Sequence, residues 1–178
     1  MTRILALDLS LTATGWAMGS HMAFTSAVLA SAKLRGMIRL NWIRGWLREV
    51  MEHDDIDLVV LEGYSFGSKG NAVINMGELG GVIRLELFDR RMPVAEVPPA
   101  SLKKYATGRG NAPKEEVLAA AIRRLDFAGH DHNEADAKWL LTMALDHYGQ
   151  LPESPVPKAH RDALAKVAWP TIERRAAA

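Results

Sequence analysis

The first apolar segment of the chain alternates strictly between two sets of side chains. In ILALDLSLTATGWA, which begins at Ile4, every second residue from Leu5 to Leu11 is a leucine, while Ile4, Ala6 and Asp8 take the other side. Alternation with a period of two is typical of a β-strand. A strand this apolar is expected inside a sheet, where the carboxylate of Asp8 loses hydration and needs a partner or a metal ion. The alternative is that Asp8 lies at a strand end and caps a neighbouring turn.

The same pattern divides the rest of the chain into strands and helices. Strands are expected over Arg3–Leu9, Thr12–Met18, Met22–Ala30, Ile56–Tyr64 and Met92–Pro99. Helices are expected over Lys33–Glu52, Asn71–Asp89, Ala100–Ala106, Pro113–Leu125 and the later part of Gly129–Gly149. This order predicts an α/β fold, with a mixed sheet and helices on both faces. Prolines at 152, 155 and 157 mark a break, so we expect one domain over 1–150 and a tail over 151–178 that forms one loose helix or none.

Composition adds few constraints to this picture. The 178 residues are enough for one domain with a sizeable core, and they contain no apolar run long enough to span a membrane. The absence of cysteine excludes a disulfide framework and a zinc–cysteine site. No signal peptide is visible, and a cytoplasmic, non-membrane protein is expected.

Charge is balanced overall but unevenly distributed. The formal net charge is +1, which by itself does not indicate a nucleic-acid partner. Basic residues at 35, 39, 44 and 48 recur along one predicted helix, and we interpret them as a solvated face. A second basic set falls in or beside a glycine-containing loop, where phosphate contact is expected; it comprises Lys103, Lys104, Arg109 and Lys114.

Three acidic residues are expected to meet. Asp8 lies in the first strand, Glu62 at the end of a buried strand, and Asp136 in the late helix. Sequential strands tend to be neighbours, and sites on α/β sheets gather where strands end. Carboxylates so close would repel one another unless divalent cations were bound, and oxygen ligands suit Mg²⁺ or Mn²⁺. We therefore expect two such ions per site, bridged by Asp8, in the arrangement used for phosphodiester hydrolysis.

A fourth metal ligand is expected one turn before Asp136. His132 at i−4 and Asn133 at i−3 share its helix face, and Glu134 does so only if the helix start is irregular. We expect His132 to be the ligand. The alternative is that Asp131 or Asn133 caps the helix while His132 is solvated.

The loop and the aromatic residues offer a nucleic-acid surface. In TGRGNAPKEEV, Gly108 and Gly110 permit close backbone approach, and the helix starting near Pro113 offers free amide groups. The alternative is an ordinary glycine-rich loop with exposed cations. Tyr64 and Phe66, which follow Glu62, could stack on unpaired bases or pack against the sheet.

Four motifs together resemble the RuvC-type Holliday junction resolvases, most closely the short forms of phages and prophages. The segments are LALDLSLTATGWA, VVLEGYSFG, VPPASLKKYATGRGNAPKEEV and HNEADA, in the family's order and spacing. The resemblance implies an RNase H-like fold, a homodimer and Mg²⁺-dependent paired nicking of four-way DNA junctions. It implies that Asp8, Glu62 and Asp136 bind metal. The sequence departs from the family pattern at Asn133, a position where a fourth acidic residue is common in the family.

The same resemblance bears on DNA contact. It implies that Lys103 and Lys114 approach the scissile strand and that Tyr64 or Phe66 stacks near the junction centre, although the offset differs by a residue. The near-neutral charge and the tail after residue 151 also depart from the family. For the dimer, we expect the helix with Gly77, Gly80 and Gly81 to pack on its copy through Leu79, Val82 and Ile83.

Other functions fit parts of the sequence. The turn after the first strand is also similar to the phosphate turn of sugar kinases and actin-like ATPases, but their two lobes need a longer chain. A module that binds junctions without cutting them would not need three intact acids. A related nuclease acting on RNA-containing substrates or other branched DNA is the main alternative, because the acids define the chemistry and not the shape of the substrate.

Overall fold

The structure, a computed structural model, describes residues 2–20, 23–64 and 71–172, and its centre is a mixed sheet. The strands of the described part are β1 (Ile4–Asp8), β2 (Ala13–Ser20), β3 (Ala23–Ala30), β4 (Leu58–Glu62) and β5 (Val94–Val97). They lie in the order β3-β2-β1-β4-β5, with antiparallel pairing from β3 to β1 and parallel pairing from β1 to β5. The predicted α/β, RNase H-like arrangement is confirmed.

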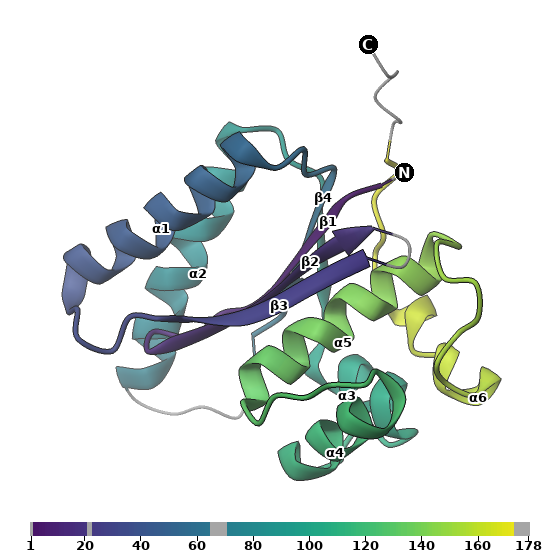
Figure 1. Ribbon diagram of the computed structural model, residues 1–178. Coiled ribbons are helices and arrows are strands. Elements are labelled where there is room, and N and C mark those ends of the chain that lie inside the picture. The colour runs from purple at the N-terminus through teal and green to yellow at the C-terminus, as the bar shows by residue number, and fades with distance from the viewer. Residues whose placement is uncertain (1, 21–22, 65–70, 173–178) are drawn as a thin grey trace.

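Helices cover both faces of the sheet. They are α1 (Gly36–His53), α2 (Asn71–Asp89), α3 (Pro99–Thr107), α4 (Lys114–Arg124), α5 (His132–His147), α6 (Lys158–Arg161) and the 3₁₀ turn η1 (Leu164–Lys166). Figure 1 shows α1 and α2 on one face and α5 on the other, with α3 and α4 packed outside α5. None of the helices in the described residues is both long and apolar enough to cross a membrane.

The alternation in β1 decides which way Asp8 points. Leu5 and Leu7 belong to the core beneath α1 and α2, whereas Ile4 and Ala6 belong to the core beneath α5. Asp8 continues the second set, because side chains two residues apart lie on the same face of a strand. Its carboxylate is therefore directed toward the side of the sheet on which α5 packs.

A glycine in β2 allows α5 to approach the sheet closely. A Cβ added at Gly15 would lie 1.9 Å from the backbone oxygen of Asn133, so a larger residue would push the first turn of α5 away. The side-chain amide of Asn133 donates a hydrogen bond to the carbonyl oxygen of Ala13 at 2.7 Å. Together these contacts hold the start of α5 against β2, one turn before Asp136.

The predicted basic set at 35, 39, 44 and 48 is only in part the solvated face that the sequence suggested, because Arg35 and Arg48 are exposed but all four side chains make contacts within the protein. The Nε atoms of Arg44 and Arg48 donate to the carboxylate of Glu86 on α2 at 2.8 and 2.7 Å, and the Glu86 side chain is only 2% exposed. Arg39 is buried and donates to the carbonyl of Leu34. This correction has a simple cause, since the partner carboxylate lies on another helix, about forty residues further along the chain.

Residues 151–172, called the C-terminal segment below, pack onto the body of the protein. The sequence suggested one loose helix here; the structure contains α6 and η1, and the segment contributes four buried side chains to the core beneath α5. These are Val156, Ala163, Leu164 and Val167. Trp169 also stacks on His147 at the end of α5, with ring centroids 4.7 Å apart. A domain boundary at residue 150 stays a prediction.

Candidate active site

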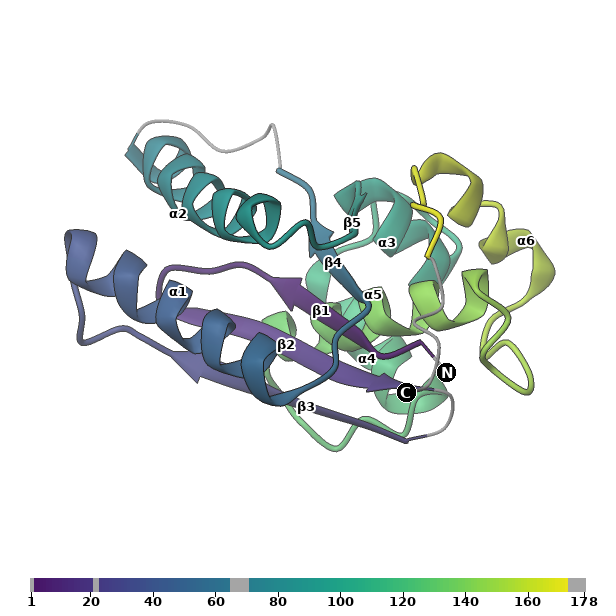
Figure 2. The same cartoon turned by 90° about the horizontal axis from the view of Figure 1, so that it is seen from above.

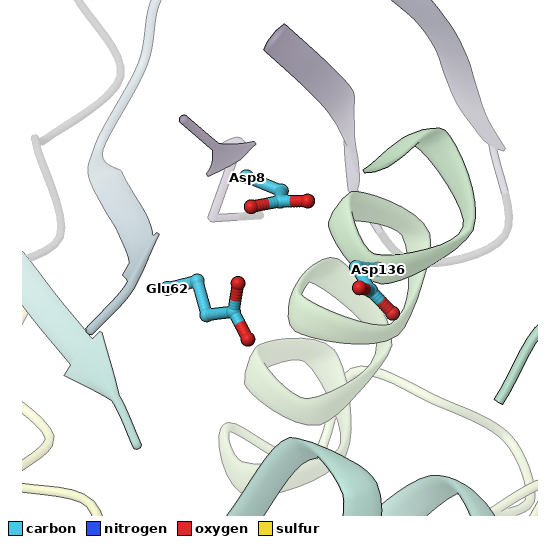
Figure 3. Close-up of side chains that lie close together, drawn as sticks. All are labelled: Asp8, Glu62 and Asp136. Carbon is cyan, nitrogen blue, oxygen red and sulfur yellow. The ribbon is translucent and has the colours of Figure 1, made fainter. Parts of the chain in front are cut away.

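Three carboxylates from distant parts of the sequence meet at one edge of the sheet. Asp8 ends β1, Glu62 ends β4, and Asp136 lies in the second turn of α5 (Figure 3). β1 and β4 are parallel neighbours, with Leu7 opposite Leu61, so their carboxyl ends place Asp8 beside Glu62. One oxygen of each carboxylate lies within 4.8 Å of the others. We call these three residues the acidic triad.

Burial makes the charge of the acidic triad unfavourable in the absence of a cation. Asp8 is 7% exposed and Asp136 is 8% exposed. Burial, together with the neighbouring Glu62 and Asp136 carboxylates, raises the pKa of Asp8 well above its usual range. Burial and the Glu62 carboxylate likewise raise the pKa of Asp136 to about 7. Crowded oxygen donors whose pKa values are raised by burial and by one another fit a site for a hard divalent cation such as Mg²⁺ or Mn²⁺.

Two lysines act electrostatically on the acidic triad. Burial raises the pKa of Glu62, and the ammonium groups of Lys114 and Lys103 oppose that rise. The same two lysines also oppose the rise for Asp136. Lys114 is the first residue of α4, and it lines a cavity of about 620 Å³ together with Asp8 and Glu62. The predicted basic residues at 103 and 114 are therefore placed beside the acids.

Of the other two predicted cations, Lys104 lies on α3 and Arg109 lies in residues 107–113, which we call the basic loop. The guanidinium of Arg109 forms an ion pair with Glu116 on α4, so part of its charge is neutralised within the protein. Lys104 follows Lys103 on α3, about 100° around the helix, and its backbone carbonyl accepts the hydrogen bond from Gly108 that ends α3. The structure therefore brings Lys103 and Lys114 to the acids more directly than it does Arg109 and Lys104.

Tyr64 lines the cavity, next to Arg84, an arginine that was not predicted from the sequence. Its side chain is 42% exposed, and its hydroxyl accepts a hydrogen bond from Arg84 of α2 at 3.0 Å. The Arg84 guanidinium also lies 4.4 Å from the centre of the Tyr64 ring and pairs with Glu96 at 2.6 Å. The sequence did offer one signal for Arg84, because it is a single cation in the otherwise apolar run of α2. Phe66 lies outside the described residues.

The first turn of α5 separates the three candidates for the fourth ligand. Asp131 caps the helix, accepting hydrogen bonds from the backbone nitrogens of Asn133 and Glu134. The Glu134 carboxylate turns toward β3, where it accepts a hydrogen bond from Ser26 at 2.8 Å. Asn133 lines the same cavity as Asp8 and Glu62. Nδ1 of His132 is buried and has no hydrogen-bond partner among the described residues, and the described acidic cluster does not include His132.

Comparison with known proteins points to one family. A family model described as crossover junction endodeoxyribonuclease RuvC matches residues 4–147. A protein of that name from Rhodopirellula baltica is 28% identical over 163 residues, which cover 88% of this chain and 90% of the relative. Another from Bartonella bacilliformis is 27% identical over 142 residues, covering 75% of this chain and 85% of the relative.

Solved structures share the fold at lower sequence identity. Thermus thermophilus RuvC in complex with a Holliday junction substrate superposes with a TM-score of 0.66 at 21% identity, covering 84% of this chain and 98% of that chain. The fowlpox virus resolvase in complex with Holliday junction DNA superposes with a TM-score of 0.55 at 15% identity, covering 83% of this chain and 99% of that chain. Since the family model spans most of the sequence, this chain belongs to the RuvC family of crossover junction endodeoxyribonucleases.

Proposed function

We propose that this protein is a structure-selective endonuclease that resolves four-way DNA junctions by paired, symmetric nicks, using divalent metal ions. The acidic triad carries the proposal, because it joins two buried carboxylates and one half-buried carboxylate, all with raised pKa values, which a cation bound between them would stabilise. The relatives of the same name and the resolvase–junction complexes of the same fold support the choice of substrate. Such an activity serves DNA recombination and repair, and the cytoplasmic location expected from the sequence stays a prediction.

Each part of the site has a role in this chemistry. Asp8, Glu62 and Asp136 hold the metal ions, which when bound supply Lewis-acid activation of water and of the scissile phosphate. Lys114 lines the cavity together with Asp8 and Glu62, and its ammonium group would bind and orient a phosphate without being a metal ligand. Burial of the acidic triad limits the access of bulk water, which strengthens each of these electrostatic interactions.

The donor set favours Mg²⁺, with Mn²⁺ as a substitute and two ions per site. For the fourth ligand, the contacts favour Asn133 over the His132 that we expected from spacing. The Asn133 amide nitrogen is held by the Ala13 carbonyl, which leaves its Oδ1 atom available in a residue that lines the cavity. A neutral amide oxygen in place of a fourth carboxylate would also reduce the like-charge repulsion among the acids.

DNA binding is assigned to the cations and aromatic side chains around the cavity. Lys103 and Lys114 contact the cleaved strand, and Lys104 and Arg109 extend the basic surface along α3 and the basic loop. Tyr64 lines the cavity, is partly exposed and is suited to stack on an unpaired base. Phe66, outside the described residues, stays a candidate for the same role.

A homodimer is proposed through α2, with different side chains from those expected. Leu79 and Ile83 of α2 are buried in the protein's own core, where they belong to the same cluster as residues of α1. The solvent-facing residues of α2 form a stripe at helical spacing, the α2 stripe, which comprises Ile74, Gly77, Gly81, Leu85 and Phe88. A Cβ at either of its glycines would meet no other atom within 4 Å, so a second helix has room to approach. Two-fold pairing of two such stripes would place two sites on one junction.

Single-turnover cleavage of three substrates side by side tests the proposed function. With Mg²⁺ present, we expect rapid cleavage of a four-way junction at two symmetric positions and much slower cleavage of a flap and of an RNA–DNA hybrid. Equal or faster cleavage of the flap or hybrid would favour the related-nuclease alternative. Junction binding without any cleavage would instead indicate a non-catalytic module.

A further inference from the structure

The C-terminal segment lies beyond the residues that the family model matches, and it packs against the helix that leads into the basic loop. The family match ends at residue 147. Both α6 and η1 contact α3, and the two views of the fold place α6 beside α3 (Figures 1 and 2). α3 carries Lys103 and ends in the basic loop, which connects it to Lys114. A segment beyond the family model's match therefore touches the helix that carries Lys103 and leads into the basic loop.

A buried carboxylate, separate from the acidic triad, joins three elements at this place. Asp146, near the end of α5, is 6% exposed. It accepts hydrogen bonds from the hydroxyls of Tyr105 on α3 and Ser154 at 2.8 and 2.9 Å. It also forms an ion pair with Arg161 of α6 at 3.0 Å. Because a buried charge needs its partners, these contacts hold the C-terminal segment firmly against α3 and α5.

His160 makes the contact nearest to the basic loop. Its Nδ1 atom lies 3.0 Å from the backbone carbonyl oxygen of Tyr105, and a carbonyl only accepts, so Nδ1 donates this hydrogen bond. The other side of the ring lies against Gly108, where an added Cβ would be 2.7 Å from Nε2. Gly108 ends α3 with a φ of +87°, a conformation that suits glycine. The imidazole thus packs on the first backbone turn of the basic loop.

We propose that the C-terminal segment is a positioning element for DNA binding, and that His160 is the positioning residue that fixes the basic loop. A loop containing Gly108 and Gly110 has many accessible conformations, and ordering it upon DNA binding would reduce the affinity. Packing of His160 on the loop orders it in advance, with Lys103 before it and Lys114 after it. This inference rests on the proposed function, in which these cations contact DNA phosphates.

Junction affinity in gel-shift assays without divalent metal tests this role in the full-length protein. With His160→Ala, we expect the dissociation constant to rise about five- to tenfold as the loop loses its preorganisation. At saturating junction, cleavage should stay within about twofold of wild type, because the acidic triad is not touched. His160→Asn keeps a donor at the position of Nδ1 and should recover part of the lost affinity.

Tyr148→Phe is the matched control. It removes the hydrogen bond from the Tyr148 hydroxyl to Pro170 at 2.7 Å, which also fastens the C-terminal segment but not at the loop. If Tyr148→Phe weakens junction binding as much as His160→Ala does, or if His160→Ala binds as wild type does, the proposed positioning role is wrong.

Amide hydrogen exchange of residues 107–113 gives a readout that does not depend on DNA. Exchange there should speed up in His160→Ala and stay at the wild-type rate in Tyr148→Phe; unchanged exchange in His160→Ala would overturn the inference. The two claims can fail separately. If the wild-type protein does not bind junctions but His160→Ala still speeds exchange in the basic loop, the proposed function is contradicted and the contact between His160 and the loop is supported.

Discussion

The charge of Asp136 opposes folding when no metal is bound, and Asp136→Asn should reveal by how much. Burial and the Glu62 carboxylate raise the pKa of Asp136 to about 7, from a usual value near 3.9 in unfolded chains. The folded protein therefore binds this proton more tightly than the unfolded chain does. The stability that this tighter proton binding contributes to the folded protein is fully present below about pH 4 and is lost as the pH rises to about 7. A rise of about 3 pKa units corresponds to about 4 kcal/mol.

Asn keeps the shape of the side chain but removes its ionisation. In EDTA at pH 8, Asp136→Asn should be about 2–4 kcal/mol more stable than the wild type. Between pH 5 and pH 8, the advantage of the variant should grow by about 2–3 kcal/mol, because only the wild type ionises at this position. Urea unfolding followed by circular dichroism at both pH values measures the difference. Saturating Mg²⁺ should then stabilise the wild type much more than the variant.

Asp146→Asn on the same helix is the matched control. Asp146 is buried to a similar extent, but it is paired with Arg161 and accepts hydrogen bonds from Tyr105 and Ser154. Removing this charge should destabilise the protein by about 2–4 kcal/mol, the opposite sign to Asp136→Asn. If both variants lose stability at pH 8 in EDTA, the interpretation of the acidic triad as a strained, cation-binding cluster is refuted.

Three further substitutions probe other parts of the account. Lys114→Ala should weaken junction binding for all sequences alike and lower the salt dependence by about one counterion; unchanged affinity and cleavage would show that Lys114 does not contact DNA. Leu85→Arg places a charge in the α2 stripe and should convert a dimer to a folded monomer in light scattering, whereas a persistent dimer would exclude that interface. Gly15→Ala puts a Cβ 1.9 Å from the Asn133 backbone oxygen and should lower both the melting temperature and the cleavage rate, and a wild-type melting temperature would contradict the close approach of α5.

The sequence predicted best the features that strand alternation and strand order determine. The period of two in the first strand correctly grouped Asp8 with Ile4 and Ala6, on the face that α5 covers. The buried strand ending in Glu62 lies parallel to it, so strand topology alone brings the two carboxylates to one edge. The position of Asp136 follows from α5 crossing that edge, as expected.

Side-chain contacts between residues far apart in the chain could not be predicted from the sequence. Spacing on α1 could not reveal that Arg44 and Arg48 pair with Glu86, because that carboxylate lies on a different helix. Both faces of α2 are apolar, so periodicity did not distinguish the buried Leu79 from the exposed Leu85.

Prolines and charges in the C-terminal segment indicated a break in the chain. They did not indicate that His160 and Arg161 of the short helix α6 would contact Tyr105 and Asp146. Such contacts depend on how α3, α5 and α6 pack together, which no local pattern encodes.

Cleavage of a four-way junction by Asp8→Asn in Mg²⁺, with a gel shift on the same junction, tests the central claim most directly. Asn fills the same space in β1 but lacks the charge that holds the metal ions. Cleavage should fall by several orders of magnitude, since activation of water and of the scissile phosphate are lost together, while folding and junction binding persist. Near-normal cleavage by Asp8→Asn would contradict the claim that the acidic triad is the catalytic metal site.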